Sequence, residues 1–441
     1  MHELRHSYTE RKISPWGGIK YFQKTYSNCK IREVLEQLDL PKPGSNRGYN
    51  PIDLIEGFMT SVVLGSRRLE HSGMLRMDEV IKSIWGWEKG MASASTFSRF
   101  LAKFDVEVND RIFPALMRYM MGLVPVKYMT IDIDSTVITR YGHQELAEKG
   151  YNPEKRGRRS HHPLLAFCDE LKMVVNAWMR SGNSHELTDI DRFLKEMFTI
   201  VPPQNIGLIR GDIGFYSERI MKQLEETEGG VPYIIKAKTT PKLLDRAIQL
   251  NKWLYLDENN IHNAYAEIVY EGNRWSNKRR IVIVRTKKPK EVIQPQLFKK
   301  YEDIDRYDYK FFATNTKLSA LEVHLRYNQR GDSENRIKEL KYDYAIEGYS
   351  LSKFGAMEAA FRFILIAFNL MAIFKQALLD QKGYKYLSTI RFQCIAIGSY
   401  LIKSGRRKEM KLAAVGQRRH FLEHIFKRFD WVQPPFSFSN A

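Results

Sequence analysis

The stretch YMTIDIDSTVI at residues 128–138 predicts a β-strand that carries two acids in its interior. Its apolar and β-branched residues favour a buried central strand. Asp132 and Asp134 are two residues apart, so both carboxylates face the same side of the strand. A charge in a buried strand is costly unless it is paired or binds a metal. Two interpretations therefore stay open for each acid: a metal site, or an ion pair with a neighbouring arginine.

The residues after this strand continue the pattern of an α/β domain. Two apolar strands come next, joined by a tight polar turn at residues 169–172. A helix with one apolar face follows, and then short strands alternate with helices. This order predicts an RNase H-like α/β domain. The expected strands lie at residues 164–167, 173–179, 206–210 and 231–237, and the expected helices at residues 184–200 and 217–225.

The charge balance points to a polyanionic partner. Lys and Arg total 70 against 51 Asp and Glu, which gives a formal net charge of +19 and a pI near 9.6. Nucleic acid and an anionic membrane surface both fit this excess. A membrane protein is disfavoured, because the first residues lack an apolar leader and the longest apolar run, residues 363–374, is shorter than a span of roughly 20 residues. We expect a soluble nucleic-acid-binding protein with three reduced, buried cysteines.

The N-terminal region, residues 1–125, is expected to be helical and to bind DNA. Ser95 is the expected N-cap of its third helix, and Arg99 and Lys103 point away from the apolar face of that helix. A short basic helix that follows another helix fits a helix-turn-helix-like reader of DNA. A plain helical bundle with a solvated basic face fits the same pattern. The expected helices lie at residues 52–63, 75–85 and 96–104.

The remaining regions surround the α/β domain. Its first part covers residues 126–240, and a β-rich insertion with short strands at residues 265–270 and 280–285 covers residues 241–307. Helices then resume. The second part of the domain is assigned to residues 308–385, and a C-terminal helical region to residues 386–441.

Asp212 is a further candidate acid, because it directly follows the apolar strand at residues 206–210. The carboxyl ends of strands in an open α/β sheet are where ligands usually bind. The alternative role for Asp212 is to cap the next helix.

Another group of chemically distinctive residues lies in YNQRGDSENRIKELK, residues 327–341. If this segment is helical, four of its side chains fall within roughly 60° around the axis. They are Tyr327, Arg330, Glu334 and Lys341. An ordinary ion-pair face is the alternative, and Gly331 argues against one unbroken helix.

These residues resemble the signatures of a known family, the DDE transposases of bacterial insertion sequences. Tyr327, Arg330, Glu334 and Lys341 match the Tyr-Arg-Glu-Lys signature of that group at its spacing. Residues 134–136 (Asp-Ser-Thr) resemble its first-aspartate motif, and residues 210–215 (Arg-Gly-Asp-Ile-Gly-Phe) its second. Residues 141–153 and 349–353 are similar to one branch of these enzymes. The resemblance extends from about Glu10 to beyond Lys375.

The resemblance implies an RNase H-like catalytic domain that binds two Mg²⁺ ions, for which Mn²⁺ can substitute. Asp134, Asp212 and Glu334 are then the catalytic and metal-binding residues. Asp134 is preferred to Asp132 because Ser-Thr follows it. The implied reaction is cut-and-paste DNA transposition. Water first frees a 3′-hydroxyl at the transposon end, and this hydroxyl then attacks the target DNA.

The implied partner is double-stranded DNA, namely the terminal inverted repeats of the element itself and its target. The resemblance also implies a homodimer that acts on paired DNA ends. It implies a location in the bacterial cytoplasm, at the nucleoid. Tyr327, Arg330 and Lys341 would contact the DNA backbone near the cut. Several relatives form a DNA hairpin, with the insertion holding a flipped base. Trp275 is the candidate stacking residue, and a tryptophan in the core of a β-hairpin is the alternative.

Arg158 and Arg159, in the basic run at residues 155–159, extend the expected DNA footprint, although each also fits a solvated face. Two other functions stay open. One is a DNA-binding relative that is catalytically silent or repurposed, against which the presence of all three acids argues. The other is a stand-alone nuclease, which shares the metal site and differs only in its products.

Overall fold

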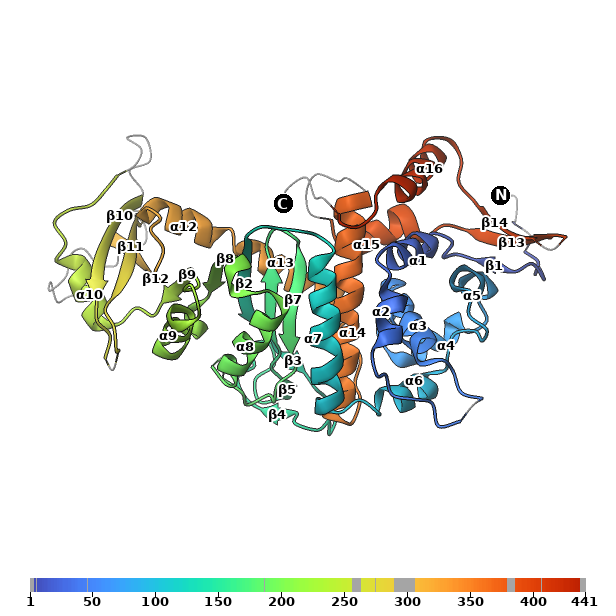
Figure 1. Ribbon diagram of the computed structural model, residues 1–441, viewed down its shortest axis with the longest axis horizontal. Helices are drawn as coiled ribbons and strands as arrows, with labels where there is room; N and C mark the ends of the chain where they lie inside the picture. The colour runs from blue at the N-terminus through green and yellow to red at the C-terminus, as the bar shows by residue number, and fades with distance from the viewer. Residues whose placement is uncertain are drawn as a thin grey trace.

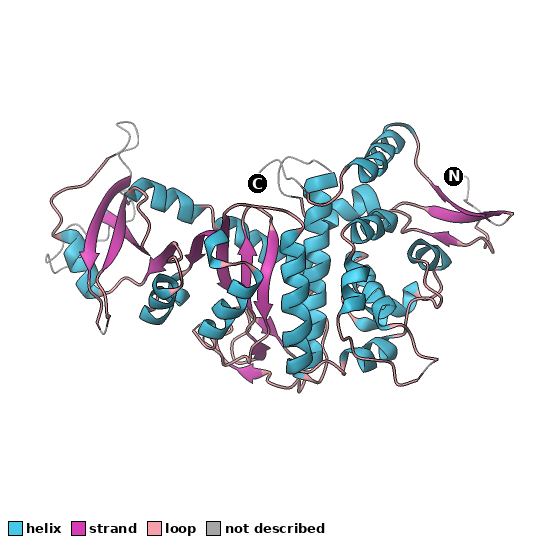
Figure 2. Cartoon of the chain, viewed as in Figure 1, coloured by secondary structure: helices cyan, strands magenta, loops and turns pink. Residues whose placement is uncertain are grey.

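The computed structural model describes residues 4, 6–45, 47–185, 187–255, 263–273, 275–288, 306–378, 385–405 and 407–436. The molecule is elongated (Figure 1). Strands of the insertion lie at one end, the main part of a large β-sheet lies in the middle, and helices from both ends of the chain lie at the other end. Figure 2 shows the same division by secondary structure.

The middle of the sheet has the strand arrangement of an RNase H-like domain, as predicted. Its central strand is β2 (Met129–Ser135). The strands β6 (Leu164–Cys168) and β7 (Met173–Trp178) follow antiparallel on one side. On the other side β8 (Ile206–Gly211) and β9 (Tyr233–Ala237) run parallel to β2. Numbered along the chain, these strands lie in the order 3-2-1-4-5.

Helices cover both faces of this sheet. The helices α7 (Val106–Gly122), α8 (Ile190–Ile200) and α14 (Phe354–Ile373) pack against β7. The helix α12 (Ala320–Asn328) lies over the opposite face and leads into α13 (Gly331–Tyr342). A further helix, α9 (Glu218–Glu226), connects β8 to β9.

The alternation of apolar residues along the strands explains the two covered faces. Ile209 and Ile235 enter the large core, whereas Leu208 and Ile234 enter a smaller core with Val323 of α12. Successive side chains of a strand point to opposite faces, so one apolar strand supplies both cores.

The helix α14 is the buried helix expected from the apolar run at residues 363–374. The polar residue that interrupts that run, Asn369, forms hydrogen bonds with β7. Its side chain accepts a hydrogen bond from the Val174 amide at 2.7 Å and donates one to the Val174 carbonyl at 2.8 Å. These two bonds pair the backbone groups of Val174 in the edge strand β7. Among the described residues, one helix, Phe354–Gln376, is long and apolar enough to cross a membrane, and its apolar window is entirely buried inside the protein.

The insertion continues the same sheet. After α10 (Pro241–Ile248) come β10 (Asn263–Tyr270), β11 (Arg279–Lys287) and β12 (Tyr307–Thr314). The strand β12 pairs antiparallel with β9, so the described part of the chain forms eight strands in the order β10-β11-β12-β9-β8-β2-β6-β7. The predicted insertion strands were too short, and β12 was missed although its residues alternate between aromatic and charged. Residues 289–305 of the insertion lie outside the described residues.

A small second sheet follows the end of β2. It consists of β3 (Ile138–Thr139), β4 (Glu148–Lys149) and β5 (Arg159–His161), with β5 in the middle. The predicted strand at residues 128–138 was therefore too long. The strand β2 ends at Ser135, and Ile138 belongs to this second sheet.

The two ends of the chain pack against each other. The strand β1 (Ile13–Ser14) pairs with β13 (Ser399–Ser404), and Tyr21 of the N-terminal region stacks on Phe429 of the C-terminal region with ring centroids 6.1 Å apart. Both regions are mainly helical, as expected, but the hairpin of β13 and β14 was not predicted. The further elements are α1 (Ile19–Asn28), α2 (Ile31–Gln37), α3 (Pro51–Val63), η1 (Leu69–His71), α4 (Ser72–Leu75), α5 (Glu79–Trp85), α6 (Ala94–Leu101), α15 (Leu387–Ile390), η6 (Arg391–Ile395), β14 (Arg407–Leu412) and α16 (Gly416–Trp431).

Three predicted helix starts were wrong. The helix α6 is capped by Ser93, whose hydroxyl accepts from the Thr96 amide at 3.2 Å, and not by Ser95. The helix expected at residues 75–85 is divided, because Asp78 caps a new helix, α5. The helix expected from residue 184 begins at Ile190, after Asp189 adopts a left-handed backbone with φ of 56°.

Candidate active site

Asp134 and Asp212 lie at the carboxyl ends of two adjacent central strands. The strands β2 and β8 run parallel, with Ile133 opposite Gly211. The next residue on each strand, Asp134 or Asp212, therefore places its carboxylate at the shared carboxyl end of the two strands. Asp212 also caps the short helix η3 (Ile213–Phe215), because its side chain accepts from the Gly214 amide at 2.9 Å. Asp212 is therefore a cap, but of this short helix and not of the helix predicted at residues 217–225, which Ser217 caps. Its role as a ligand stays a prediction.

The two carboxylates interact electrostatically. Burial raises the pKa of Asp134, Arg330 opposes this rise, and the carboxylate of Asp212 adds to it, so that the pKa is about 6. Two carboxylates that repel each other at a partly buried edge favour a nearby cation.

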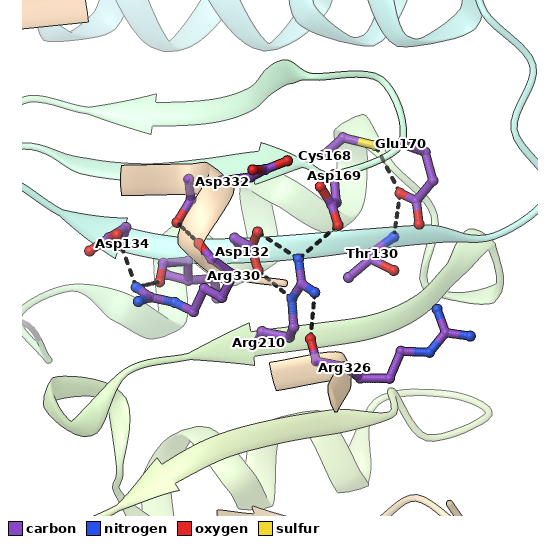
Figure 3. A network of polar contacts seen from close by, with 12 residues as sticks. Thr130, Asp132, Asp134, Cys168, Asp169, Glu170, Arg210, Arg326, Arg330 and Asp332 are labelled. Atoms are coloured by element: carbon purple, nitrogen blue, oxygen red, sulfur yellow. Dashed lines mark hydrogen bonds and ion pairs between the residues drawn. The ribbon is translucent and has the colours of Figure 1, made fainter. Parts of the chain in front are cut away.

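The cation beside Asp134 in the structure is Arg330 (Figure 3). Its guanidinium lies 2.9 Å from the Asp134 carboxylate and donates to the Ile133 carbonyl at 3.1 Å. Arg330 is almost fully buried at the junction between α12 and α13. The break between these helices falls where Gly331 predicted one. Tyr327, in the last turn of α12, belongs to the same group. Burial raises its pKa to about 12. Arg330 lowers this pKa, and Asp212 raises it.

Glu334 lies on the side of α13 that carries Arg330 and Lys341. Arg330 contacts Asp134 just before the helix begins, and Lys341 forms ion pairs near its end, with Glu154 at 3.1 Å and Glu347 at 3.2 Å. Helical geometry places Glu334 between these two contacts on the same stripe. Its side chain is exposed, and it shares a helical stripe with Arg330, which contacts Asp134.

The structure brings two of the three expected acids together and leaves the third apart. Within the described ranges, no group of three His, Cys, Asp or Glu side chains is close enough to hold one metal ion. Asp134 and Asp212 are close enough to interact electrostatically, whereas Glu334 on α13 does not complete a group of three with them. The donor chemistry fits a magnesium site, since all three groups are carboxylates and Mg²⁺ prefers oxygen ligands.

Asp132 has a different role from Asp134, because Arg210 binds both of its oxygens. The distances are 2.6 Å to one oxygen and 2.8 Å to the other, and both side chains are fully buried. Figure 3 shows that Arg210 also contacts Asp169 and the Arg326 carbonyl. Asp169 in turn binds Arg336 of α13 at 2.9 Å. This buried network joins β2, β8, the turn after β6 and the α12–α13 unit, and so fixes the helix that carries Glu334.

We expect the network to make the fold sensitive to acid through Asp169. Burial alone raises the pKa of this carboxyl, but Lys172, Arg210 and Arg336 together hold the pKa at about 2. A folded-state pKa below the unfolded value of about 3.9 stabilises the fold above that pH by about 2 to 3 kcal/mol, and this stabilisation is lost as pH falls from about 5 to 2. Urea unfolding of Asp169→Asn should therefore show a large deficit against wild type at pH 7 and a much smaller one at pH 2. A deficit of equal size at both pH values would contradict this role.

Trp275 lies at the turn between β10 and β11, close in space to the second aspartate motif. It packs against Tyr216 and Tyr270 with ring centroids 5.8 Å apart in each case, and the Arg279 guanidinium lies 5.0 Å from its ring. Tyr216 follows Asp212 by four residues. The half-buried ring thus combines hairpin packing with a contact to the segment that follows Asp212, and its role in stacking stays a prediction.

The other expected DNA contacts lie in separate places. Arg99 and Lys103 are exposed at the end of α6, in the helical part of the molecule. Arg158 and Arg159 are exposed beside the small sheet that follows β2.

The sequence did not reveal Asp169 and Arg336, which extend the ion pair of Asp132 and Arg210 into a network. They are ordinary residues of a turn and a helix, and their spacing in the sequence carries no signal. Arg210 did carry one, since an arginine at the end of an apolar strand needs a buried acid as its partner.

The fold and this edge define a class of protein, an RNase H-like α/β protein with two aspartates at the carboxyl ends of adjacent parallel strands. The chain matches the family model of the transposase DDE domain, group 1, over residues 2–433, and it therefore belongs to this family of transposases.

Among solved structures, the chain is similar to a cryo-EM structure of the piggyBac transposase synaptic complex with hairpin DNA. The TM-score is 0.44 and the sequence identity 12%, and the match covers 85% of this chain and 78% of that chain. No curated protein matches the chain significantly.

Proposed function

We propose that this chain is an active transposase that binds the ends of an insertion sequence, cleaves there and joins the freed ends to target DNA. The observation that carries the proposal is the meeting of Asp134 and Asp212 at the carboxyl edge of β2 and β8, on the side to which α13 presents Glu334. Membership of the transposase family supports the same reaction.

Asp134, Asp212 and Glu334 would hold the metal ions of such an enzyme, two Mg²⁺ with Mn²⁺ as a substitute. Divalent ions supply charge stabilisation for the attacking and leaving oxygens of a phosphoryl displacement. The residues of the chain contribute the rest. The buried network around Asp132 holds β2, β8 and α13 in place. The partly buried edge around Asp134 strengthens electrostatic interactions there.

The basic residues fit DNA as the partner of this site. The net charge of +19 favours the phosphate backbone, with affinity that falls steeply as salt rises. Arg158 and Arg159 lie on the small sheet directly after the strand that carries Asp134, and Arg99 and Lys103 offer a second contact in the helical region. Trp275 is the proposed stacking residue of the insertion. A homodimer on paired ends at the bacterial nucleoid is part of the same proposal.

Arg330 and Lys341 should act on the DNA end more than on overall DNA affinity. Their side chains flank Glu334 on α13, and guanidinium and ammonium groups suit phosphate oxygens. We expect Arg330→Ala and Lys341→Ala to slow end cleavage by about tenfold or more, while affinity for random duplex falls by less than about threefold. Cleavage rates and filter binding with the same variants measure both quantities. Losses of equal size in both would argue against a position at the cut.

The alternatives differ from the proposal in their products. A stand-alone nuclease cuts DNA without joining it, and a silent relative only binds it. A transposon end with a ready-made 3′-hydroxyl, incubated with protein, Mg²⁺ and a supercoiled plasmid, separates the three. We expect covalent joining of the labelled end to the plasmid. Cleavage without joining would favour the nuclease, and binding without either reaction would favour the silent relative.

A further inference from the structure

Two exposed tyrosines emerge from the same end of the small sheet. The strands β3 and β4 both run antiparallel to β5, and Thr139 of β3 and Glu148 of β4 both lie opposite Ser160. The chain then continues from both strands in the same direction, to Tyr141 on one side of β5 and Tyr151 on the other. Both tyrosines are largely exposed, at 67% and 70%. Strand spacing places the two segments roughly 10 Å apart.

Basic side chains lie beside the Tyr141 ring. The Lys155 ammonium lies 4.8 Å from the centroid of the Tyr141 ring and bonds to its hydroxyl, and the Arg158 guanidinium lies 5.7 Å from the same centroid. Lys155 and Arg158 form no ion pair with a carboxylate in the part of the chain that the structure describes, and the nearby Glu154 is paired with Lys341. We call Tyr141, Tyr151, Lys155 and Arg158 the tyrosine rim.

The tyrosine rim is attached firmly to the candidate active site. Directly after Asp134, the Ser135 hydroxyl bonds to His162 at 3.1 Å, which ties the end of β2 to the residue that follows β5. Arg140, next to Tyr141, is buried and donates to His161 at 3.1 Å and to the Glu347 carbonyl at 3.1 Å. Tyr141 follows Asp134 by seven positions in the chain, so their Cα atoms lie at most roughly 25 Å apart.

We propose that the tyrosine rim binds unpaired nucleotides of single-stranded DNA next to the cut, an inference that rests on the proposed function. A ring face can stack on a base only where that base is unpaired, because duplex DNA offers its backbone and groove edges instead. Lys155 and Arg158 beside the Tyr141 ring would neutralise the phosphates between stacked bases. A rigid aromatic and basic surface loses little conformational freedom when it binds such a strand.

Fluorescence anisotropy with two labelled probes tests the proposal, a single strand of about 12 nucleotides and a duplex of the same sequence. Tyr141→Ala and Tyr151→Ala should each weaken binding of the single strand by about 5- to 100-fold and binding of the duplex by less than about twofold. Tyr141→Phe keeps the ring and should bind the single strand like wild type, which separates stacking from any disturbance of the fold.

Tyr128→Ala is the matched control. Tyr128 is also exposed and has the Lys127 ammonium 5.2 Å from its ring centroid, but it precedes β2 at the opposite end of the strand. Its loss should not change binding of either probe. Equal losses for single strand and duplex in the rim variants, or no loss, would overturn the proposal while the transposase function stands. Failure of the wild-type protein to bind either probe would contradict the proposed function as well.

Discussion

Replacement of Glu334 by glutamine is expected to slow DNA cleavage by about a thousandfold or more and to leave DNA affinity nearly unchanged. The third carboxylate of a metal site contributes several kcal/mol to the stabilisation of the transition state, and about 1.4 kcal/mol corresponds to tenfold in rate. Glutamine keeps the size of the side chain and removes its charge. Because Glu334 is exposed, the free energy of unfolding should change little.

Asp332 provides the matched control for Glu334. It is also an exposed acid in the first turn of α13, but it faces the other side of the helix, where it pairs with Lys172 at 3.1 Å. We expect Asp332→Asn to cleave at close to the wild-type rate, since an exposed ion pair contributes less than about 1 kcal/mol. Single-turnover cleavage of a labelled transposon end compares the two variants. Normal cleavage by Glu334→Gln, or an equal defect in Asp332→Asn, would remove Glu334 from the site.

The second large effect is a difference in stability between variants of the two aspartates of β2. Asp132→Ala should lower the free energy of unfolding by about 3 to 5 kcal/mol, because it leaves the fully buried Arg210 without its main partner. Asp134→Asn should leave stability unchanged or slightly higher, since the fold raises the pKa of Asp134 and so disfavours its charge. It should nevertheless abolish cleavage.

Chemical denaturation of the two variants measures this contrast. The double variant Asp132→Leu, Arg210→Met serves as the control, because an apolar pair of similar volume can replace a buried ion pair with little cost. It should recover a large part of the stability that Asp132→Ala loses. Equal destabilisation by Asp132→Ala and Asp134→Asn would show that both aspartates are structural partners of arginine.

The sequence predicted the central sheet well, because each strand is a short apolar run that ends at a turn. The two acids of β2 were visible for the same reason, and so was the position of Asp212 at a strand end. The choice between Asp132 and Asp134 could not be made from spacing alone, since both face the same side. It depends on Arg210, whose register opposite Asp132 exists only in the folded sheet.

Other features escaped prediction for identifiable physical reasons. The small sheet is built from strands of two or three residues, which carry no periodic pattern. The strand β12 pairs with β9, which lies about 70 residues earlier in the chain, and such pairing depends on tertiary contacts. The signature of α13 was clear in the sequence. The ion pair between Arg330 and Asp134, and the separation of Glu334 from the aspartates, required the structure.

A labelled duplex that carries the repeat flanking the gene tests the transposase function directly. The protein and its Asp212→Ala variant are each incubated with this duplex, with and without Mg²⁺, and the strands are resolved at nucleotide resolution. We expect nicks at the transposon boundary that require both Mg²⁺ and Asp212, while the variant still binds the duplex. Boundary nicks by Asp212→Ala would contradict the proposed transposase function, as would tight binding by the wild-type protein with no cleavage at all.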